Sequence, residues 1–264
     1  MSNKLGGARR YAVISGKGGV GKSVISANLA AAFARSGNRT LALDADLGLA
    51  SLDVILGLEV RHTLHDVLHK KCTLRQAIIR APGGFDLLPA DSGVKEGTIL
   101  TPWIVERLEE LLASVSSRYD AILFDAGAGI GDVVIHFARL AHEVLLVVTP
   151  EPTSMMDAYA TIKILAKLCG RRTIRLIVNR AGPKGADVTG AAVAGRLQHV
   201  AAKFLGSDNQ SKVCLDLIGS IPTDSTFVRA ASRQQLLVET APEAPSVAAI
   251  ERVAKTLLAG VHSG

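Results

Sequence analysis

The segment GKGGVGKS, residues 16–23, places glycines around two lysines and a serine in the G-x-x-x-x-G-K-[ST] pattern of a phosphate-binding loop. Glycines allow several backbone N–H groups to converge on one phosphate, and the N-terminus of a following helix adds partial positive charge. In this interpretation Lys22 reaches the β- and γ-phosphates, and the Ser23 hydroxyl is a ligand of Mg²⁺. The other expected nucleotide contacts of the segment are Gly16, Lys17, Gly18, Gly19, Val20, Gly21 and Val24. One lysine satisfies the pattern, so Lys17 requires a separate explanation.

Two expected strands end in aspartates, and a metal-bound nucleotide needs an acidic residue at such a strand end. The segment LALDADLG contains Asp44 and Asp46, and the segment AILFDAGAG contains Asp125 followed by Gly127. Asp125 fits a Walker B aspartate that leads into a glycine-rich switch loop, where the N–H of Gly127 could contact a γ-phosphate. Aspartates also end strands as solvated residues. Two such strands in a chain with a phosphate loop nevertheless favour a metal site and the hydrolysis of ATP or GTP.

The elements that must position these residues follow from the apolar pattern. Near-continuous apolar runs such as EVLLVVT indicate strands that are buried on both faces of a parallel sheet. Strands are expected at 11–15, 40–44, 85–89, 120–125, 143–149, 174–179 and 215–221, and helices at 22–36, 101–117, 132–141, 153–168, 187–204 and 246–260. Because strands and helices alternate, the prediction is an α/β fold: a doubly wound, mostly parallel sheet of seven or eight strands with helices on both faces. Residues 1–264 are expected to form this single domain, with a flexible segment at 1–10.

Composition limits the class of protein. Aromatic residues are only 4% of the 264 residues, so the core must consist mainly of Ala, Leu, Ile and Val. The net charge of +6 permits contact with nucleic acid or anionic lipid, but no basic run favours either. Cys72, Cys169 and Cys214 form no CxxC pair, and the first residues do not resemble a secretory leader, so a cytoplasmic location is expected.

The segment KGGVGKS resembles the deviant Walker A motif of the MinD/ParA ATPases, which the additional lysine distinguishes. Four further segments are similar to the branch of that family that regulates the number of flagella: LDADLGLASLDVILGL, FDAGAGIGD, VVTPEPTSMMDAYATIKIL and FVRAASRQQLLVETAPEAPSVAAI. The resemblance extends over about residues 11–258. It implies ATP rather than GTP, because the segment VNR lacks the aspartate of a guanine-binding NKxD motif.

The resemblance also implies individual roles. Lys17 would cross the interface of an ATP-sandwich homodimer to contact the partner's nucleotide, while Lys22 would bind phosphate in its own subunit. Asp46 would orient the attacking water. The expected metal site consists of Ser23, Asp44 and Asp125, the expected contacts near the base are Asn179, Pro222 and Asp224, and Arg180 is a further expected nucleotide contact. Hydrolysis would then be slow and dependent on dimerisation, since a lysine supplied across an interface acts like an arginine finger.

The expected function is an ATP-dependent switch that sets the number or placement of flagella through protein partners, such as a signal-recognition-type GTPase. The alternative is a ParA-type partitioning ATPase that binds DNA without sequence preference. Ala126 stands where the family usually has Thr or Ser, and only about ten residues precede the first strand, whereas many flagellar regulators carry a longer GTPase-activating extension.

Three other clusters have a functional and a structural interpretation. An apolar stripe in the terminal helix, Val247, Ile250, Val253, Leu257 and Val261, suits either peripheral membrane contact or, as favoured here, core packing. His62, His65, His69 and Cys72 share the spacing of one helical face, which favours an exposed surface over a zinc site. The arginine clusters Arg171, Arg172 and Arg175, and Arg229 and Arg233, favour solvated surfaces over a DNA-binding site.

Overall fold

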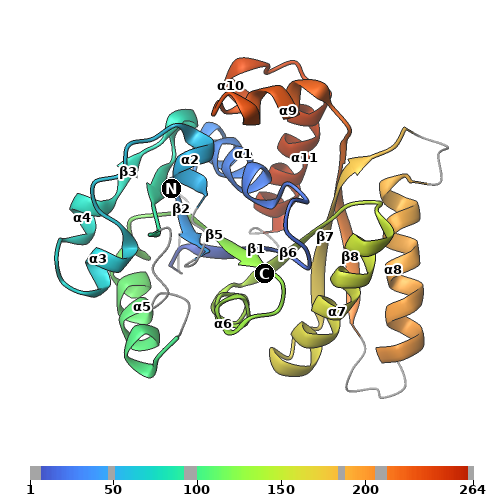
Figure 1. The fold of residues 1–264 in the computed structure, drawn as a ribbon, viewed down its shortest axis with the longest axis horizontal. Helices are drawn as coiled ribbons and strands as arrows, with labels where there is room; N and C mark the ends of the chain where they lie inside the picture. The colour runs from blue at the N-terminus through green and yellow to red at the C-terminus, as the bar shows by residue number, and fades with distance from the viewer. Residues whose placement is uncertain (1–6, 47–50, 92–99, 184–187, 206–212, 261–264) are drawn as a thin grey trace.

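The strands of the computed structural model form one eight-stranded sheet in the order β3-β4-β2-β5-β1-β6-β7-β8 (Figure 1). The structure describes residues 7–46, 51–91, 100–183, 188–205 and 213–260. The strands are β1 (Arg9–Ser15), β2 (Thr40–Ala45), β3 (Ile79–Arg80), β4 (Asp86–Leu88), β5 (Ala121–Ala128), β6 (Glu143–Val148), β7 (Thr173–Ala181) and β8 (Cys214–Pro222). Among the described residues only the edge pair β3–β4 is antiparallel. This confirms the predicted fold class.

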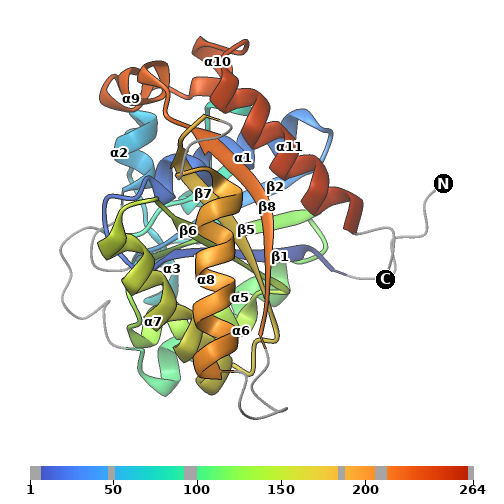
Figure 2. The ribbon, with the colours of Figure 1, turned by 90° about the vertical axis from the view of Figure 1, so that its right-hand side faces the viewer.

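Helices cover both faces of the sheet, as Figures 1 and 2 show. They are α1 (Lys22–Arg35), α2 (Leu52–Leu56), α3 (Leu64–Leu68), α4 (Leu74–Ala77), α5 (Pro102–Val115), α6 (Asp132–Leu140), α7 (Pro152–Leu168), α8 (Gly190–Leu205), α9 (Ser225–Ser232), α10 (Leu237–Thr240) and α11 (Pro245–Ala259), with a 3₁₀ turn η1 at Pro82–Gly84. Helices α1, α2 and α9–α11 pack on one face, and α3–α8 pack on the other.

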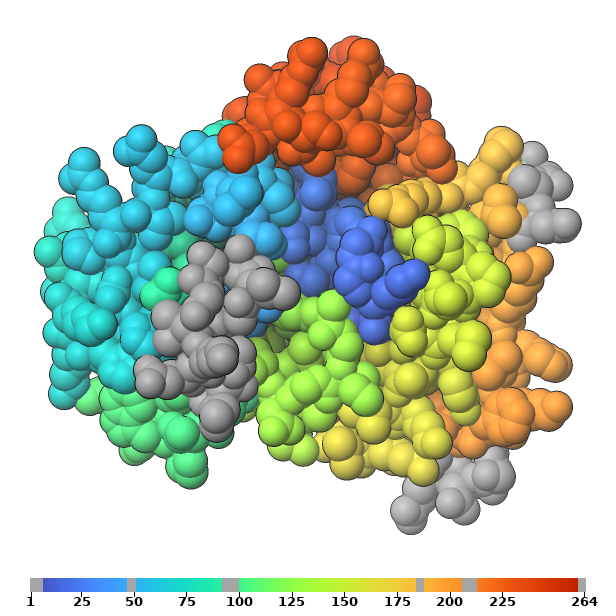
Figure 3. Space-filling model, in the orientation of Figure 1, coloured from blue at the N-terminus to red at the C-terminus, as the bar shows by residue number. Residues whose placement is uncertain are grey.

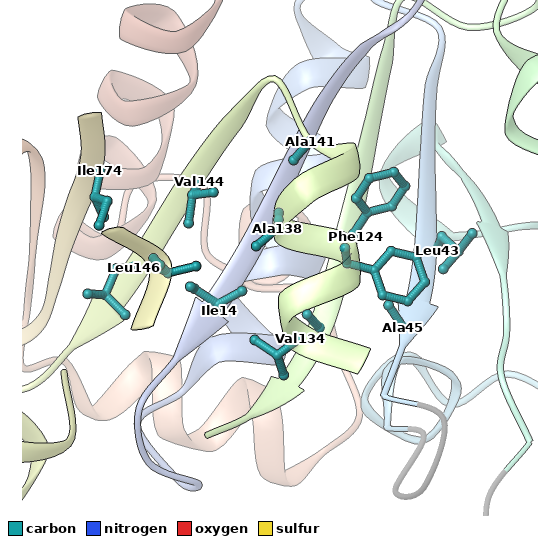
Figure 4. Packing of buried hydrophobic residues seen from close by; sticks show 14 of the residues in the cluster. Ile14, Leu43, Ala45, Phe124, Val134, Ala138, Ala141, Val144, Leu146 and Ile174 are labelled. Carbon is teal, nitrogen blue, oxygen red and sulfur yellow. The ribbon is translucent and has the colours of Figure 1, made fainter. Parts of the chain in front are cut away.

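Each face has its own apolar core, because successive residues of every strand point to opposite faces. On one face, Ile14 and Phe124 lie under α6, where the rings of Phe124 and Phe137 are 5.1 Å apart (Figure 4). On the other face, Tyr11 and Phe33 have ring centroids 5.3 Å apart. Strands buried on both faces account for the near-continuous apolar runs in the sequence.

The chain order places β1 at the point where the sheet's connections diverge. From β1 the chain first builds β2, β4 and β5 on one side, and it then builds β6, β7 and β8 on the other. In open α/β sheets, ligands bind beyond the carboxyl ends of the strands at such a switch point. The loop that follows β1 therefore lies where the fold favours a binding site.

Some predicted elements differ in extent from the observed ones, and some observed elements were not predicted. Strand β5 continues to Ala128 instead of ending at residue 125, and the edge strand β3 and the short helices α2, α4 and α10 were not predicted. Helix α3 ends at Leu68, and Lys70 has a left-handed φ of 58°. Cys72 therefore does not continue the helical face of His65 and His69, whose rings stack 4.2 Å apart.

The terminal helix α11 packs in the core, as predicted. Val247, Ile250, Val253 and Leu257 are all buried, while Val261 lies outside the described residues. This core lies on the face of the sheet that α1 covers. The Tyr11 hydroxyl of β1 also donates a hydrogen bond to the Leu257 carbonyl of α11. In the part of the chain that the structure describes, no helix combines the length and apolar character that a bilayer span requires.

Candidate functional site

The loop between β1 and α1 lies at the centre of the face formed by the carboxyl ends of the strands (Figure 3). Gly21 precedes α1 with a φ of 89°, a left-handed conformation that costs glycine little. A Cβ at this position would also lie 2.5 Å from Asn179 Nδ2. Among the described residues, no side chain caps the N-terminus of α1, and its first turn contains no acidic residue. Backbone N–H groups and the helix dipole thus remain available to an anion.

The loop packs tightly against the start of α7. A Cβ on Gly16 would lie 2.3 Å from the carbonyl carbon of Asp157, so only glycine fits at this position. The Ser15 hydroxyl donates to the Lys17 carbonyl over 2.9 Å. The backbone of α7 and the Ser15 side chain therefore fix the backbone conformation at the start of the loop.

A cluster of buried charges lies beneath the loop. Asp44 of β2 and Asp125 of β5 are paired directly across the two strands, and both are completely buried. The Lys22 ammonium lies 2.8 Å from Asp125 Oδ1, which also accepts a hydrogen bond of 2.7 Å from the Ser26 hydroxyl. One buried lysine thus contacts one of two adjacent buried carboxylates.

Asp44 has an altered acidity as a result. Burial, together with the charge of Asp125, raises the pKa of Asp44 to about 7. Three backbone N–H groups act in the opposite direction: those of Ser51 and Leu52 donate to Asp44 Oδ2 over 2.9 and 3.0 Å, and that of Asp46 donates to Oδ1 over 3.1 Å. The burial effect is larger, so two adjacent anions are costly here until another cation is present.

The residues of this cluster fit a magnesium ion. Asp125 Oδ2 is buried and has no hydrogen-bond partner among the described residues. The Ser23 hydroxyl lies nearby, 3.1 Å from Lys22 Nζ and 3.1 Å from the Ser51 hydroxyl. Hydroxyl and carboxylate oxygens are the donors that Mg²⁺ prefers, and an unpaired buried carboxylate oxygen suits a water held by the ion. We conclude that Ser23, Asp44 and Asp125 form a suitable donor set.

Asp46 and Gly127 lie side by side at the mouth of the cluster. A Cβ on Gly127 would lie 3.3 Å from Asp46 Oδ2, so the carboxylate approaches the backbone of the glycine-rich segment after β5. The neighbouring Gly129 donates its N–H to the Ser15 carbonyl at the end of β1 over 2.8 Å. The structure therefore brings the predicted switch segment, Asp46 and the loop together.

The Lys17 side chain is bound by the start of α7. Its ammonium donates to Thr153 Oγ1 over 2.9 Å and lies 3.5 Å from Glu151 Oε2. The Lys17 side chain is 40% exposed, whereas that of Lys22 is 8% exposed. The two lysines of the loop thus occupy different environments, one buried among carboxylates and one at the surface.

The predicted residues near the base come from the ends of β7 and β8. Asn179 is buried and donates to the Val20 carbonyl over 2.8 Å, and Arg180 donates to the Gly19 carbonyl over 3.1 Å. Pro222 pairs with Ala181 across the two strands. Asp224 caps α9 at the Thr226 N–H and accepts from the Ser246 hydroxyl over 2.7 Å, and these hydrogen bonds lower its pKa.

Sequence reasoning missed several residues of the site: Ser26, Ser51, Glu151 and Thr153. Ser26 lies one helical turn after Lys22, so helical spacing from the loop lysine could have identified it. Ser51 and Thr153 reach the site only through the fold, and no local pattern distinguishes them. Glu151 lies in the PEPTS segment, to which the resemblance to the family assigns no individual role.

Comparisons with known proteins agree with this arrangement. The ParA family model, described as NUBPL iron-transfer P-loop NTPase, matches residues 8–258. The antiactivator FleN of Pseudomonas aeruginosa is 40% identical over 244 residues, which are 92% of this chain and 84% of FleN. The flagellum site-determining protein YlxH of Helicobacter pylori is 34% identical over 262 residues, 98% of this chain and 85% of YlxH.

A solved structure extends the match to the fold and to bound ligands. The septum site-determining protein MinD of Pyrococcus horikoshii, complexed with Mg-ADP, superposes with a TM-score of 0.77 at 27% identity, covering 96% of this chain and 98% of MinD. The family match covers nearly the whole chain and includes the two-lysine loop, both aspartate strands and the switch segment. The chain therefore belongs to the ParA/MinD family of P-loop ATPases.

Proposed function

We propose that this protein is an ATP-hydrolysing switch that dimerises on binding ATP and regulates the number or placement of flagella through protein partners. The observation that carries the ATPase is the buried Lys22 beside Asp44 and Asp125, directly below an uncapped loop and helix N-terminus. The flagellar role rests on the similarity to FleN and YlxH, whose names refer to an antiactivator and to flagellum site determination. Its protein partners are expected to be flagellar assembly or regulatory proteins, for example a signal-recognition-type GTPase.

In this proposal the phosphates of ATP are held by the loop. The backbone N–H groups of residues 16–24 surround them, and Lys22 exchanges its contact with Asp125 for the β- and γ-phosphates. Ser23, Asp44 and Asp125 would hold Mg²⁺. When bound, the ion supplies positive charge against the negative charge of the phosphates. It also offsets the two buried carboxylates, which explains why their proximity is tolerated.

Hydrolysis depends on a positioned water and on the switch segment. Asp46 orients the attacking water, since its carboxylate lies at the mouth of the cluster beside Gly127. The N–H of Gly127 contacts the γ-phosphate, so the segment after β5 differs between the ATP and ADP states. Asn179, Pro222 and Asp224, at the ends of β7 and β8, are expected near the base, and Arg180 is a further expected residue of the nucleotide site.

Lys17 completes the site of a second copy. Its ammonium is at the surface, and its contacts with Thr153 and Glu151 are of the kind that cost little to break. On dimerisation Lys17 reaches the partner's nucleotide and stabilises the transferred charge. ATP hydrolysis then occurs at a significant rate only in the dimer.

We expect the protein to act in the cytoplasm, with peripheral contact at the inner face of the membrane as the alternative state. Partitioning on DNA is less favoured. Arg171 donates to the carbonyls of Ala138 in α6 and of His142 just before β6, and Arg175 pairs with Glu143 and Asp216. These two arginines are therefore occupied in the structure and are poorly placed to bind phosphate backbones.

Two variants test the switch by size-exclusion chromatography with light scattering. With Mg-ATP, we expect Asp46→Ala to accumulate as a dimer, because ATP binds but the attacking water is not oriented. Lys17→Ala should stay monomeric while it still binds ATP. Arg172→Ala, at an exposed position on the amino side of β7, is the control and should behave like the wild type. A monomeric Asp46→Ala, or a Lys17→Ala variant that dimerises normally, would contradict the proposed switch.

A further inference from the structure

The end of β7 binds the outer side of the phosphate loop through two successive residues. Asn179 Nδ2 donates to the Val20 carbonyl over 2.8 Å, and Arg180 Nη2 donates to the Gly19 carbonyl over 3.1 Å. Both acceptors are backbone groups of the loop. The two side chains therefore hold consecutive peptide units rather than loop side chains.

These contacts fix the direction of the loop's N–H groups. In a trans peptide the carbonyl and the N–H of the same unit point in opposite directions, and the described residues contain no cis peptide bond. When the Gly19 and Val20 carbonyls face β7, the N–H groups of Val20 and Gly21 point to the opposite side, where they are available to an anion. The contacts thus orient two donors before any ligand arrives.

The backbone of Arg180 has the unusual conformation that this contact requires. Its φ is 55°, a left-handed value that residues with a Cβ adopt at a cost of about 1 kcal/mol or more. The pairing of β7 with β8 shifts register between Val178 and Ala181, and the Arg180 N–H donates to Asn179 Oδ1 over 2.9 Å. The strand is therefore bulged at Arg180, and the side chain leaves the sheet in the direction of the loop.

A second contact anchors the guanidinium. Arg180 Nη1 lies 3.4 Å from Glu151 Oε1, and the other oxygen of Glu151 lies 3.5 Å from the Lys17 ammonium. The side chains of Arg180 and Glu151 are each half exposed, so these pairs add little to the free energy of unfolding. Their effect is geometric: one guanidinium links β7, the loop and the start of α7.

We propose that Arg180 is a positioning residue for the phosphate loop, which acts on the triphosphate through the Gly19 carbonyl and not by touching the base or ribose. This inference rests on the proposed nucleotide site. It adds to that site a residue outside the loop that determines the affinity for the triphosphate. It predicts that loss of the guanidinium weakens the binding of any polyphosphate, whether or not a nucleoside is attached.

The test uses glycine at position 180, because Arg180→Gly removes the guanidinium while the left-handed backbone is retained without strain. The matched control is Lys70→Gly, which also removes an exposed cation from a left-handed residue, φ 58°, at the end of α3. Binding of Mg-ATP and of Mg-tripolyphosphate to the full-length protein is measured by calorimetry. We expect Arg180→Gly to bind both ligands about tenfold more weakly, with Arg180→Lys in between and Lys70→Gly unchanged.

The two ligands separate the alternatives. A loss confined to ATP would mean that Arg180 contacts the base or ribose directly, and equal affinities for wild type and Arg180→Gly would mean that the contact has no effect on binding. Either result overturns the inference, as does an equal loss in Lys70→Gly. A wild-type protein that binds neither ligand would instead overturn the nucleotide site on which the inference rests.

Discussion

Charged side chains are arranged differently at the two ends of the strands. We call the side of the sheet where the parallel strands begin the amino edge, and the side where they end the carboxyl edge. At the amino edge, Arg9, Glu143, Arg175 and Asp216 lie on the neighbouring strands β1, β6, β7 and β8, with alternating sign and with contacts from each residue to the next. At the carboxyl edge, Asp44 and Asp125 stand directly opposite each other and are completely buried, and Lys22 contacts Asp125.

This difference distinguishes a structural edge from a functional one. Alternating charges that water still reaches contribute little each, but they leave no charge unbalanced. Two buried carboxylates with one lysine cost stability, and such an arrangement persists where a bound ligand supplies the missing positive charge. The carboxyl edge is thus adapted to Mg²⁺ and phosphate at the expense of the ligand-free protein.

The largest expected effect comes from removing the buried cation. Lys22→Met leaves Asp125 without its ion pair, so we expect the free energy of unfolding without ligand to fall by about 3 kcal/mol. ATP hydrolysis should fall by about a hundredfold or more, because the phosphate charge loses its nearest cation. Urea unfolding and a phosphate-release assay measure the two effects.

The amino edge provides the control for this variant. Arg9→Met removes one cation from a network that is partly exposed, so the expected loss is about 1 kcal/mol or less, with hydrolysis unchanged. If the two variants lost equal stability and equal activity, the contrast between the edges would be wrong.

The next effect concerns pH. Asp44 has a pKa near 7 in the folded, metal-free protein and near 3.9 when unfolded, so between these values the folded state binds more protons. The contribution of this group to stability is therefore lost as the pH rises from about 4 through 7. In EDTA, the wild type should lose on the order of 2 kcal/mol more than Asp44→Asn between pH 5.5 and 8.

The measurement is urea unfolding of both proteins across that pH range. Saturating Mg-ATP should remove most of the difference for the wild type, because the bound ion favours the charged carboxylate. If the free energies of unfolding of wild type and Asp44→Asn changed in parallel with pH in EDTA, burial of Asp44 would not be the cause of the charge imbalance at the carboxyl edge.

The long elements could be predicted because their pattern is local. The strand of residues 143–149 and the helix of residues 22–36 differ from the observed β6 and α1 by one residue at their ends. Helices α2, α4 and α10 have only four or five residues, too few to show a helical period. Strand β5 extends to Ala128 because that residue pairs with Ser15, and a segment of glycine and alanine carries no strand signal of its own.

The residues of the site also divide into those that a local sequence pattern predicts and those that depend on the fold. The loop glycines, Lys22 and the strand-end aspartates follow from type and spacing, and the structure brings them together. The contact of Arg180 with the Gly19 carbonyl spans 161 positions and depends on a bulge in β7. The sequence contains no signal for a left-handed arginine, because the fold imposes that conformation and sets its direction.

A smaller effect is expected from the centre of the amino-edge network. Glu143 contacts both Arg9 and Arg175, so Glu143→Gln leaves two neighbouring arginines without their shared anion. We expect a loss of about 1 kcal/mol in the free energy of unfolding, with ATP binding unchanged. High salt should reduce the loss, because it screens partly exposed charges. Altered ATP affinity in Glu143→Gln would mean that the two edges are coupled.

The smallest expected effect tests whether negative charge is uncompensated along the whole carboxyl edge or only at β2 and β5. Asp224 follows β8 on this edge, but its carboxylate is satisfied by the Ser246 hydroxyl and the Thr226 N–H, which lower its pKa. A carboxyl with a lowered pKa contributes stability above its unfolded value, and that contribution is lost as the pH falls.

Ser246→Ala should therefore cost about 0.5 kcal/mol above pH 5, because solvent and Thr226 still support the carboxylate, and the cost should disappear as the pH falls below about 3.9, the usual pKa of an unfolded Asp, and through the lowered pKa of folded Asp224. Ser232→Ala removes a hydroxyl that donates only to the Val228 carbonyl, so its effect should not depend on pH. The difference between the two variants in urea unfolding, followed from pH 3 to pH 7, isolates Asp224. A cost that grows towards acid pH would place Asp224 with Asp44 and extend the imbalance to the whole edge, whereas the expected decline confines it to the strands that face the phosphate loop.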